Sequence, residues 1–350
     1  FLTNTIQGKC LFTMLVSIYT SRVILDVLGI DDYGLYQTVG GIVGFLAFIN
    51  GALSAGSSRF ITFALGENNE NKLKETFSTT FLIHLALAFV VVILAETIGS
   101  WFLYYKLQIA QERMDAAVYV FHLSVITAFL NLVQTPFSAV IIAREKMAIY
   151  AYVSIFEVSL KLLIVYLLLL GNFDKLVLYA TLLCILQIGL IWFYLFYCRY
   201  KFHEVRFSVS CNPSVLRKLL GYSGWNLLGS ISVALNDQGI LILLNMFFNP
   251  AVVASRAVSL QVKMAAVQFV NNFRTAVNPQ IIKKYAAHDE AGSRKLLLSS
   301  TKYSFYLMLI LGVPICLMAD SILHIWLKEV PPYAVPFLQI AVMTSVFNVF

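Results

Sequence analysis

Three basic residues in one apolar segment form the clearest candidate site in this sequence. Arg256, Lys263 and Arg274 fall within about 20° of one line when the segment is drawn as a helix. A buried charge is costly in an apolar medium, so these side chains face either water or the inside of a helix bundle. Extension of the two arginines to opposite membrane surfaces would explain the ends of the stripe but not Lys263. We therefore expect the stripe to line a cavity, where its cations would favour an anion.

Two further arginines and one carboxylate are candidates for the same site. Arg22 lies one helical turn from Asp26, a spacing that also suits a structural ion pair. Arg59 lies near the end of an apolar segment and either extends to the membrane surface or contacts a phosphate. Asp237 stands between two amide residues, and it serves either as a proton- or cation-coupling carboxylate or as the partner of Lys263.

Glycines share a helical face with Arg59. Gly34, Gly41 and Gly51 fall on the same line, and glycines at this spacing are typical of close helix packing. We therefore expect this face to contact another helix.

The sequence carries no recognised enzyme signature. It lacks the GxxxxGK[ST] phosphate loop and the HExxH zinc motif. Its five cysteines form no CxxC pair and have no histidine at metal-binding spacing. A glycosyltransferase or polymerase would usually carry a large loop with catalytic side chains, which the sequence also lacks. We therefore expect neither enzymatic activity nor a metal or other cofactor.

The elements that hold these residues are apolar segments long enough to cross a bilayer. Hydrophobic residues make up 59% of the 350 residues and charged residues 12%, against about 25% charged in soluble proteins. We expect transmembrane helices of about twenty residues, ten in all, near 8–28, 35–58, 78–102, 117–142, 149–170, 176–197, 223–247, 251–276, 303–325 and 334 onward.

The net charge of +7 also fits a membrane protein. The basic residues lie mainly in alternate loops, as the positive-inside rule requires, and this argues against nucleic-acid binding. We predict a multi-pass protein of the cytoplasmic (inner) membrane with its N-terminus in the cytoplasm.

A weak internal repeat predicts two lobes. A shift of 222 residues aligns Asn4 with Asn226 and residues 65–79 with 287–301. We predict an all-α polytopic bundle of two pseudo-repeated six-helix lobes, related by an axis along the membrane normal. The predicted parts are the N-terminal lobe 1–198, the cytoplasmic loop 199–221, and the C-terminal lobe 222–350. The same shift places Phe350 inside a fourth helix, so we expect this second lobe to be incomplete.

The stretch Ser21–Phe45 (SRVILDVLGIDDYGLYQTVGGIVGF) and the segment Ser54–Gly66 (SAGSSRFITFALG) resemble the multidrug/oligosaccharidyl-lipid/polysaccharide exporter superfamily. Within it the chain looks most like the polysaccharide-biosynthesis branch, the flippases for lipid-linked O-antigen and capsule units. The resemblance implies two lobes around a central cavity, with the first, second, seventh and eighth helices lining it. It also places Arg22 and Arg59 on the substrate path.

Two functions follow from this resemblance. The first is a flippase for a polyprenyl-diphosphate-linked oligosaccharide in surface polysaccharide assembly, with the lipid bilayer, the glycan and glycosyltransferases or a polymerase as partners. The excess of membrane-embedded Arg and Lys over Asp and Glu favours it. The alternative is a cation-coupled multidrug exporter, which would need carboxylates in its cavity; Asp26 and Asp237 are the candidates.

Overall fold

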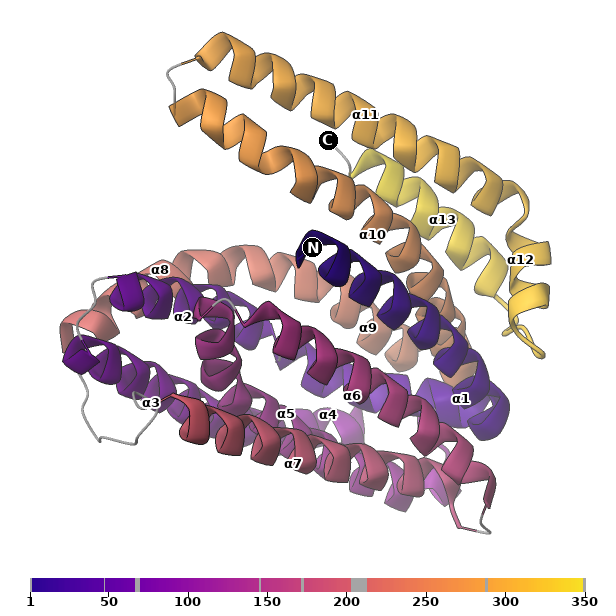
Figure 1. Cartoon of the computed structure of the whole chain (residues 1–350). Coiled ribbons are helices and arrows are strands. Elements are labelled where there is room, and N and C mark those ends of the chain that lie inside the picture. The colour runs from indigo at the N-terminus through magenta and orange to yellow at the C-terminus, as the bar shows by residue number, and fades with distance from the viewer. Residues whose placement is uncertain are drawn as a thin grey trace. The chain divides into compact units, whose positions relative to one another are not determined.

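The computed structural model describes residues 2–46, 48–66, 70–144, 146–170, 173–202, 213–286 and 289–348. Every regular element within these ranges is a helix (Figure 1). The chain divides into two compact units, Phe1–Pro250 and Ala251–Phe350. The all-α prediction is therefore confirmed.

The first unit holds the larger set of helices. They are α1 (Leu2–Leu46), α2 (Phe48–Gly66), α3 (Glu70–Leu94), the π-helix η1 (Ala95–Gly99), α4 (Ser100–Tyr105), the 3-10 helix η2 (Gln111–Arg113), α5 (Met114–Ala143), α6 (Met147–Leu167), the 3-10 helix η3 (Leu168–Leu170), α7 (Lys175–Lys201), α8 (Pro213–Ala234), the π-helix η5 (Leu235–Gly239) and α9 (Ile240–Phe247). The second unit is built from α10 (Pro250–Ala286), whose first residue still belongs to the first unit, α11 (Glu290–Leu317), α12 (Ala319–Trp326) and α13 (Ala334–Phe347).

Five helical segments among the described residues are long and apolar enough to cross a membrane, judged by length and composition. They are Glu70–Tyr105, Gln111–Ala143, Ala148–Leu167, Lys175–Lys201 and Glu290–Leu317, and Ala334–Phe347 is a shorter apolar helix. Exposed aromatic side chains such as Trp192 and Phe196 on α7 suit contact with lipid rather than water. The chain is a multi-pass membrane protein.

A glycine separates the first two predicted spans. Helix α1 contains one residue with non-helical geometry, Gly29, whose φ of 79° lies in the left-handed region that glycine adopts without a steric penalty. The helical segment before Gly29 is the first predicted span. The part of α1 after it, together with α2, covers the second.

The ninth predicted span is displaced along the sequence. We expected it at 303–325, but α11 already begins at Glu290 and ends at Leu317. The Asp289 side chain caps its N-terminus by accepting a hydrogen bond of 2.8 Å from the backbone nitrogen of Gly292. Polar residues that the hydropathy pattern assigned to a loop are thus the first turns of the helix, and α12 holds the end of the predicted span.

Helix α5 lies at the centre of the packing in the first unit, where it contacts α1, α2, α3, α6 and α7. Three aromatic rings join it to α3, with Phe137 placed edge-on to Phe77 and Phe81 at centroid distances of 5.7 and 5.8 Å. Helices α8 and η5 also belong to this unit, and α8 packs against α2. In the second unit, α11 and α12 pack against α13.

Two glycines of the predicted face, Gly34 and Gly41, lie close to other segments of the first unit. A Cβ atom on Gly34 would lie 2.0 Å from the Pro250 carbonyl oxygen, so the two backbones approach closely here. A Cβ on Gly41 would touch the Gln238 side chain at 3.5 Å. Gly51 lies outside the described side chains. The division into lobes at 198 and 222 follows the internal repeat and stays a prediction.

Candidate functional site

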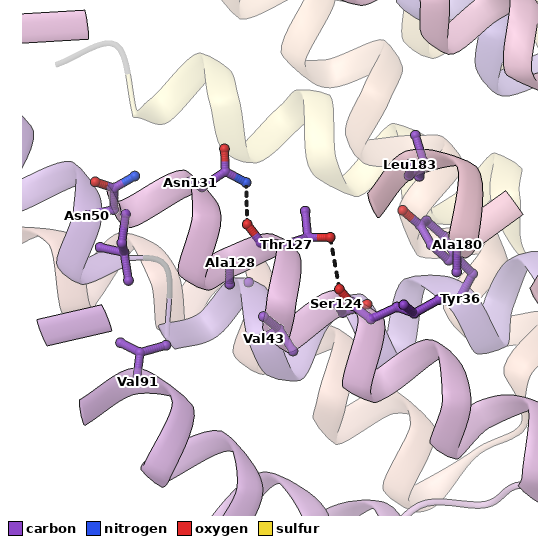
Figure 2. Close-up of a pocket in the computed structure, with 14 residues that line it drawn as sticks. Tyr36, Val43, Asn50, Val91, Ser124, Thr127, Ala128, Asn131, Ala180 and Leu183 are labelled. Atoms are coloured by element: carbon purple, nitrogen blue, oxygen red, sulfur yellow. Dashed lines mark hydrogen bonds between the residues drawn. The ribbon is translucent and has the colours of Figure 1, made fainter. Parts of the chain in front are cut away.

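A cavity of about 300 Å³ lies among the helices of the first unit (Figure 2). Its walls come from helices far apart in the sequence, namely α1, α2, α3, α5 and α7. The lining residues are Tyr36, Gly40, Val43, Gly44, Asn50, Val91, Leu123, Ser124, Thr127, Ala128, Asn131, Leu132, Ala180 and Leu183.

Helix α5 supplies the polar wall of this cavity. Ser124, Thr127 and Asn131 follow one another at helical spacing, which places their side chains on one face. Each side chain donates to a carbonyl four residues earlier: Ser124 to Val120 at 2.8 Å, Thr127 to Leu123 at 2.8 Å and Asn131 to Thr127 at 3.1 Å. The last of these bonds is drawn in Figure 2. These local bonds lower the cost of polar groups in an apolar helix.

Two polar contacts between helices flank this wall. The Thr135 hydroxyl donates to the Asn50 carboxamide oxygen at 2.8 Å, which connects α5 to α2. The Gln187 amide donates to the Gln134 carboxamide oxygen at 2.8 Å, which connects α7 to α5. Because such bonds have a preferred direction, they orient the three helices around the cavity.

The cavity is neutral. None of its described lining residues carries a charged side chain, so its polar groups offer hydroxyls and carboxamides that both donate and accept hydrogen bonds. Such a surface suits an uncharged or amphipathic ligand better than a bare ion. No group of three or more His, Cys, Asp or Glu residues that could hold a metal ion occurs among the described residues.

The two predicted cations of the first unit lie outside the cavity wall. Arg22 is half-buried on α1. Arg59 is exposed on α2, and its guanidinium stacks over the Tyr222 ring of α8 at 4.9 Å. Besides the two roles expected from the sequence, extension to the membrane surface and contact with a phosphate, Arg59 therefore has a third, which is to join two helices.

The three predicted cations of the second unit share helix α10. Arg256 is buried, with 8% of its surface exposed, while Lys263 and Arg274 are half-buried. Ser259, on the same helix, donates to the Ala334 carbonyl at 3.0 Å. The stripe is therefore shielded from the medium around the unit to different degrees along its length. Asp237 belongs to η5, and its side chain lies outside the described side chains.

A second cavity, of about 550 Å³, lies beside the turn at Gly29. Arg113 of η2 reaches two carboxylates there, Asp32 through Nη2 and Asp174 through Nη1. Burial raises the pKa of Asp32, and the adjacent Arg113 charge acts in the opposite direction. Arg113 thus connects the turn after the first span to the loops before α5 and α7.

The residues that line the first cavity were not predicted from the sequence. The signal was present as a run of polar residues at helical spacing in an otherwise apolar segment, Ser124, Thr127, Asn131 and Thr135. This run did not by itself indicate a site, because neutral polar residues are common in transmembrane helices as packing contacts. The cavity identifies which face of α5 is open.

Comparisons with known proteins agree with this architecture. The MatE family model matches residues 8–167, which is somewhat less than half of the chain. A search of curated proteins gives no match.

Several solved structures are similar over nearly the whole chain. An inward-facing multidrug resistance MATE family transporter of the MOP superfamily has a TM-score of 0.75 at 15% identity, covering 95% of this chain and 77% of that one. An outward-facing structure of such a transporter gives 0.70 at 15%, covering 99% and 79%. The MATE multidrug transporter DinF-BH, solved as a complex, gives 0.68 at 16%, covering 93% and 73%. The chain has the fold of these transporters.

Proposed function

We propose that this chain belongs to the MatE family and is a secondary exporter that moves an amphipathic organic solute across the membrane by alternating access. The observation that carries the proposal is the similarity of nearly the whole chain to transporters solved in both inward-facing and outward-facing conformations. Three of the solved structures are named as multidrug transporters, which favours the multidrug alternative over the flippase that the sequence suggested.

The neutral cavity of the first unit supports a role for it in the solute path. Its apolar residues provide contact for a hydrophobic body, and the polar face of α5 provides hydrogen bonds to a few polar groups. A neutral hydrogen bond contributes about 0.5–1.5 kcal/mol. The loss of one such contact should therefore weaken solute binding by roughly three- to tenfold without abolishing it.

The test compares two threonines with the same local bonding. Thr127 and Thr181 both donate to the carbonyl four residues earlier, at 2.8 and 2.7 Å, but only Thr127 lines the cavity. The full-length gene is expressed in a bacterial host that lacks its own drug exporters, and efflux of a fluorescent amphipathic dye is measured. We expect Thr127→Val to raise the KM for efflux and Thr181→Val to leave it unchanged.

Absence of efflux by the unaltered, correctly inserted protein over a panel of cationic, neutral and anionic dyes would contradict the exporter proposal. Equal effects of the two valine variants would remove the cavity from the solute path. Membrane levels of each variant, measured by immunoblot, separate a loss of transport from a loss of protein.

A specific observation favours a second candidate function, the flipping of a polyprenyl-diphosphate-linked oligosaccharide. The α10 stripe sets three cations on one helix face, and Arg256 is almost fully buried. Cations in such surroundings suit a diphosphate. In this case Lys263→Gln should abolish surface polysaccharide in a complementation assay, whereas Lys295→Gln, at an exposed position of α11, should not. Full activity of Lys263→Gln would exclude the stripe from the path of such a substrate.

We further propose that the protein lies in the cytoplasmic membrane with its N-terminus in the cytoplasm, as the distribution of basic residues indicates. In that orientation Arg113 and its two carboxylates lie at the outer surface.

A further inference from the structure

One buried histidine has no part in the proposed solute path. His84 lies in α3 with none of its surface exposed. Its Nε2 atom lies 2.8 Å from the hydroxyl oxygen of Ser57, an equally buried residue of α2. Its other ring nitrogen, Nδ1, is buried without a hydrogen-bond partner of good geometry among the described groups. A buried polar atom without a hydrogen bond lowers the stability of the fold, so a nearby acceptor for this nitrogen is expected.

The backbone of α5 supplies the missing counterpart. Pro136 lies inside this helix, and a proline has no amide hydrogen to donate to the carbonyl four residues earlier. That carbonyl belongs to Leu132, a residue that packs against Ala88, one helical turn from His84 on α3. Leu132 itself packs in an apolar cluster with Ala88 and Val91 of α3. An acceptor that has lost its helical donor thus faces a ring nitrogen that can supply one.

We propose that His84 is a positioning residue: its Nδ1–H group takes the place of the amide that Pro136 lacks and holds the broken turn of α5 against α3. The Ser57 hydroxyl then donates to Nε2, which selects the neutral tautomer with its proton on Nδ1. One side chain in this way connects α2, α3 and α5.

The broken turn is part of the cavity wall. Leu132 and its neighbour Asn131 both line the cavity, and the Asn131 carbonyl accepts a 3.0 Å bond from the Thr135 hydroxyl. A change in the turn between Leu132 and Pro136 would therefore move the polar groups that face the solute. His84 acts on the cavity from behind its wall, without touching the solute.

Two substitutions test the hydrogen bonds of the two ring nitrogens independently. In His84→Asn the amide nitrogen occupies roughly the place of Nδ1, so a donor toward Leu132 remains while the Ser57 contact is lost. In His84→Gln the longer side chain reaches toward Ser57 and leaves the Leu132 carbonyl without a donor. We expect His84→Gln to lower the Tm of the purified full-length protein by about 2–4 °C more than His84→Asn.

The decisive variant restores the amide instead of the histidine. Pro136→Ala gives the Leu132 carbonyl its ordinary helical donor. His84→Gln should therefore lower the Tm less in the Pro136→Ala background than in the unaltered protein. We expect the double variant to regain at least half of the Tm lost in His84→Gln. If His84→Gln alone does not accumulate in the membrane, its accumulation in the Pro136→Ala background replaces the Tm as the measure.

Additive effects of the two substitutions would overturn the proposal, as would equal Tm values for His84→Gln and His84→Asn, or a double variant that fails to accumulate. The transport measurement rests on the proposed function, and there His84→Gln should raise the KM for efflux about three- to tenfold, with recovery in the double variant. The Tm cycle is independent of any substrate. A cycle with rescue and no efflux would therefore contradict the exporter proposal alone, whereas efflux with an additive cycle would contradict only the role of His84.

Discussion

Replacement of Arg113 by glutamine tests the electrostatics of the loop end of the first unit. The Arg113 side chain is 39% exposed, its partner Asp174 is 35% exposed, and Asp32 is 12% exposed. The pair with Asp174 is close to a surface ion pair, which contributes about 0.2–1 kcal/mol. The pair with Asp32 is better shielded, and a hydrogen bond to a charged group contributes about 1.5–3 kcal/mol.

Because the arginine itself is partly solvated, the lower half of that range applies to Asp32. The two contacts together give a loss of about 1.5–3 kcal/mol for Arg113→Gln at neutral pH. At about 2 °C per kcal/mol, this corresponds to a Tm lower by about 3–6 °C. Lys106→Gln is the matched control, since Lys106 is an exposed cation of the same loop whose contact is the Trp101 ring at 5.3 Å.

The effect should depend on pH in a defined direction. Burial already raises the pKa of Asp32 above that of an exposed aspartate, and loss of the Arg113 charge should raise it further. A carboxyl whose pKa is raised in the folded state stabilises the fold at low pH, and this contribution is lost as the pH rises through the folded pKa. The Tm deficit of Arg113→Gln should therefore be largest near neutral pH and smaller near pH 4.

The assay is thermal unfolding of the purified full-length protein in detergent at both pH values. Addition of Asp32→Asn to Arg113→Gln should recover part of the Tm at neutral pH, because no buried charge is then left unpaired. A deficit of the same size at both pH values, or a loss equal to that of Lys106→Gln, would refute the electrostatic reasoning.

Two further pairs of substitutions test contacts within the first unit. Gly34→Ala should reduce the amount of folded protein recovered by size-exclusion chromatography, since its Cβ would lie 2.0 Å from the Pro250 carbonyl, whereas Gly189→Ala, with open space around it, should be neutral or slightly stabilising. Asn245→Ala should lower the Tm more than Gln108→Ala. The buried Asn245 side chain accepts a 3.0 Å hydrogen bond from the Gln108 backbone nitrogen, and Gln108→Ala keeps this bond because it leaves the backbone unchanged. Gln108→Ala removes only the 3.4 Å hydrogen bond from the Gln108 side chain to the Met246 carbonyl. Equal losses within either pair would contradict the contact that distinguishes its members.

The class of protein and most of its helices follow from the sequence alone. A segment such as 176–197 must be helical, because in lipid each backbone polar group needs a partner within its own segment. Helix ends were less predictable. The start of α11 depends on the cap that Asp289 provides, and capping groups extend a helix beyond its apolar part.

The candidate site shows a different division between sequence and structure. The spacing of Ser124, Thr127 and Asn131 puts them on one helix face, so the polar wall of the cavity could have been predicted from the sequence. The other walls were not, because Tyr36 and Ala180 reach the same cavity from α1 and α7. Which faces meet depends on the rotation and packing of every helix in the unit.

Charge is the property for which the sequence alone was least informative. Hydropathy predicts that Arg59 avoids lipid, but several arrangements satisfy that condition, and only the structure shows the Tyr222 ring beneath it. The same holds for His84, whose role depends on a proline 52 positions away in the chain. The free energy of transfer from water to lipid depends on each residue type and can be estimated from the local sequence. The hydrogen-bond and ring partners of a side chain depend instead on how distant segments pack together.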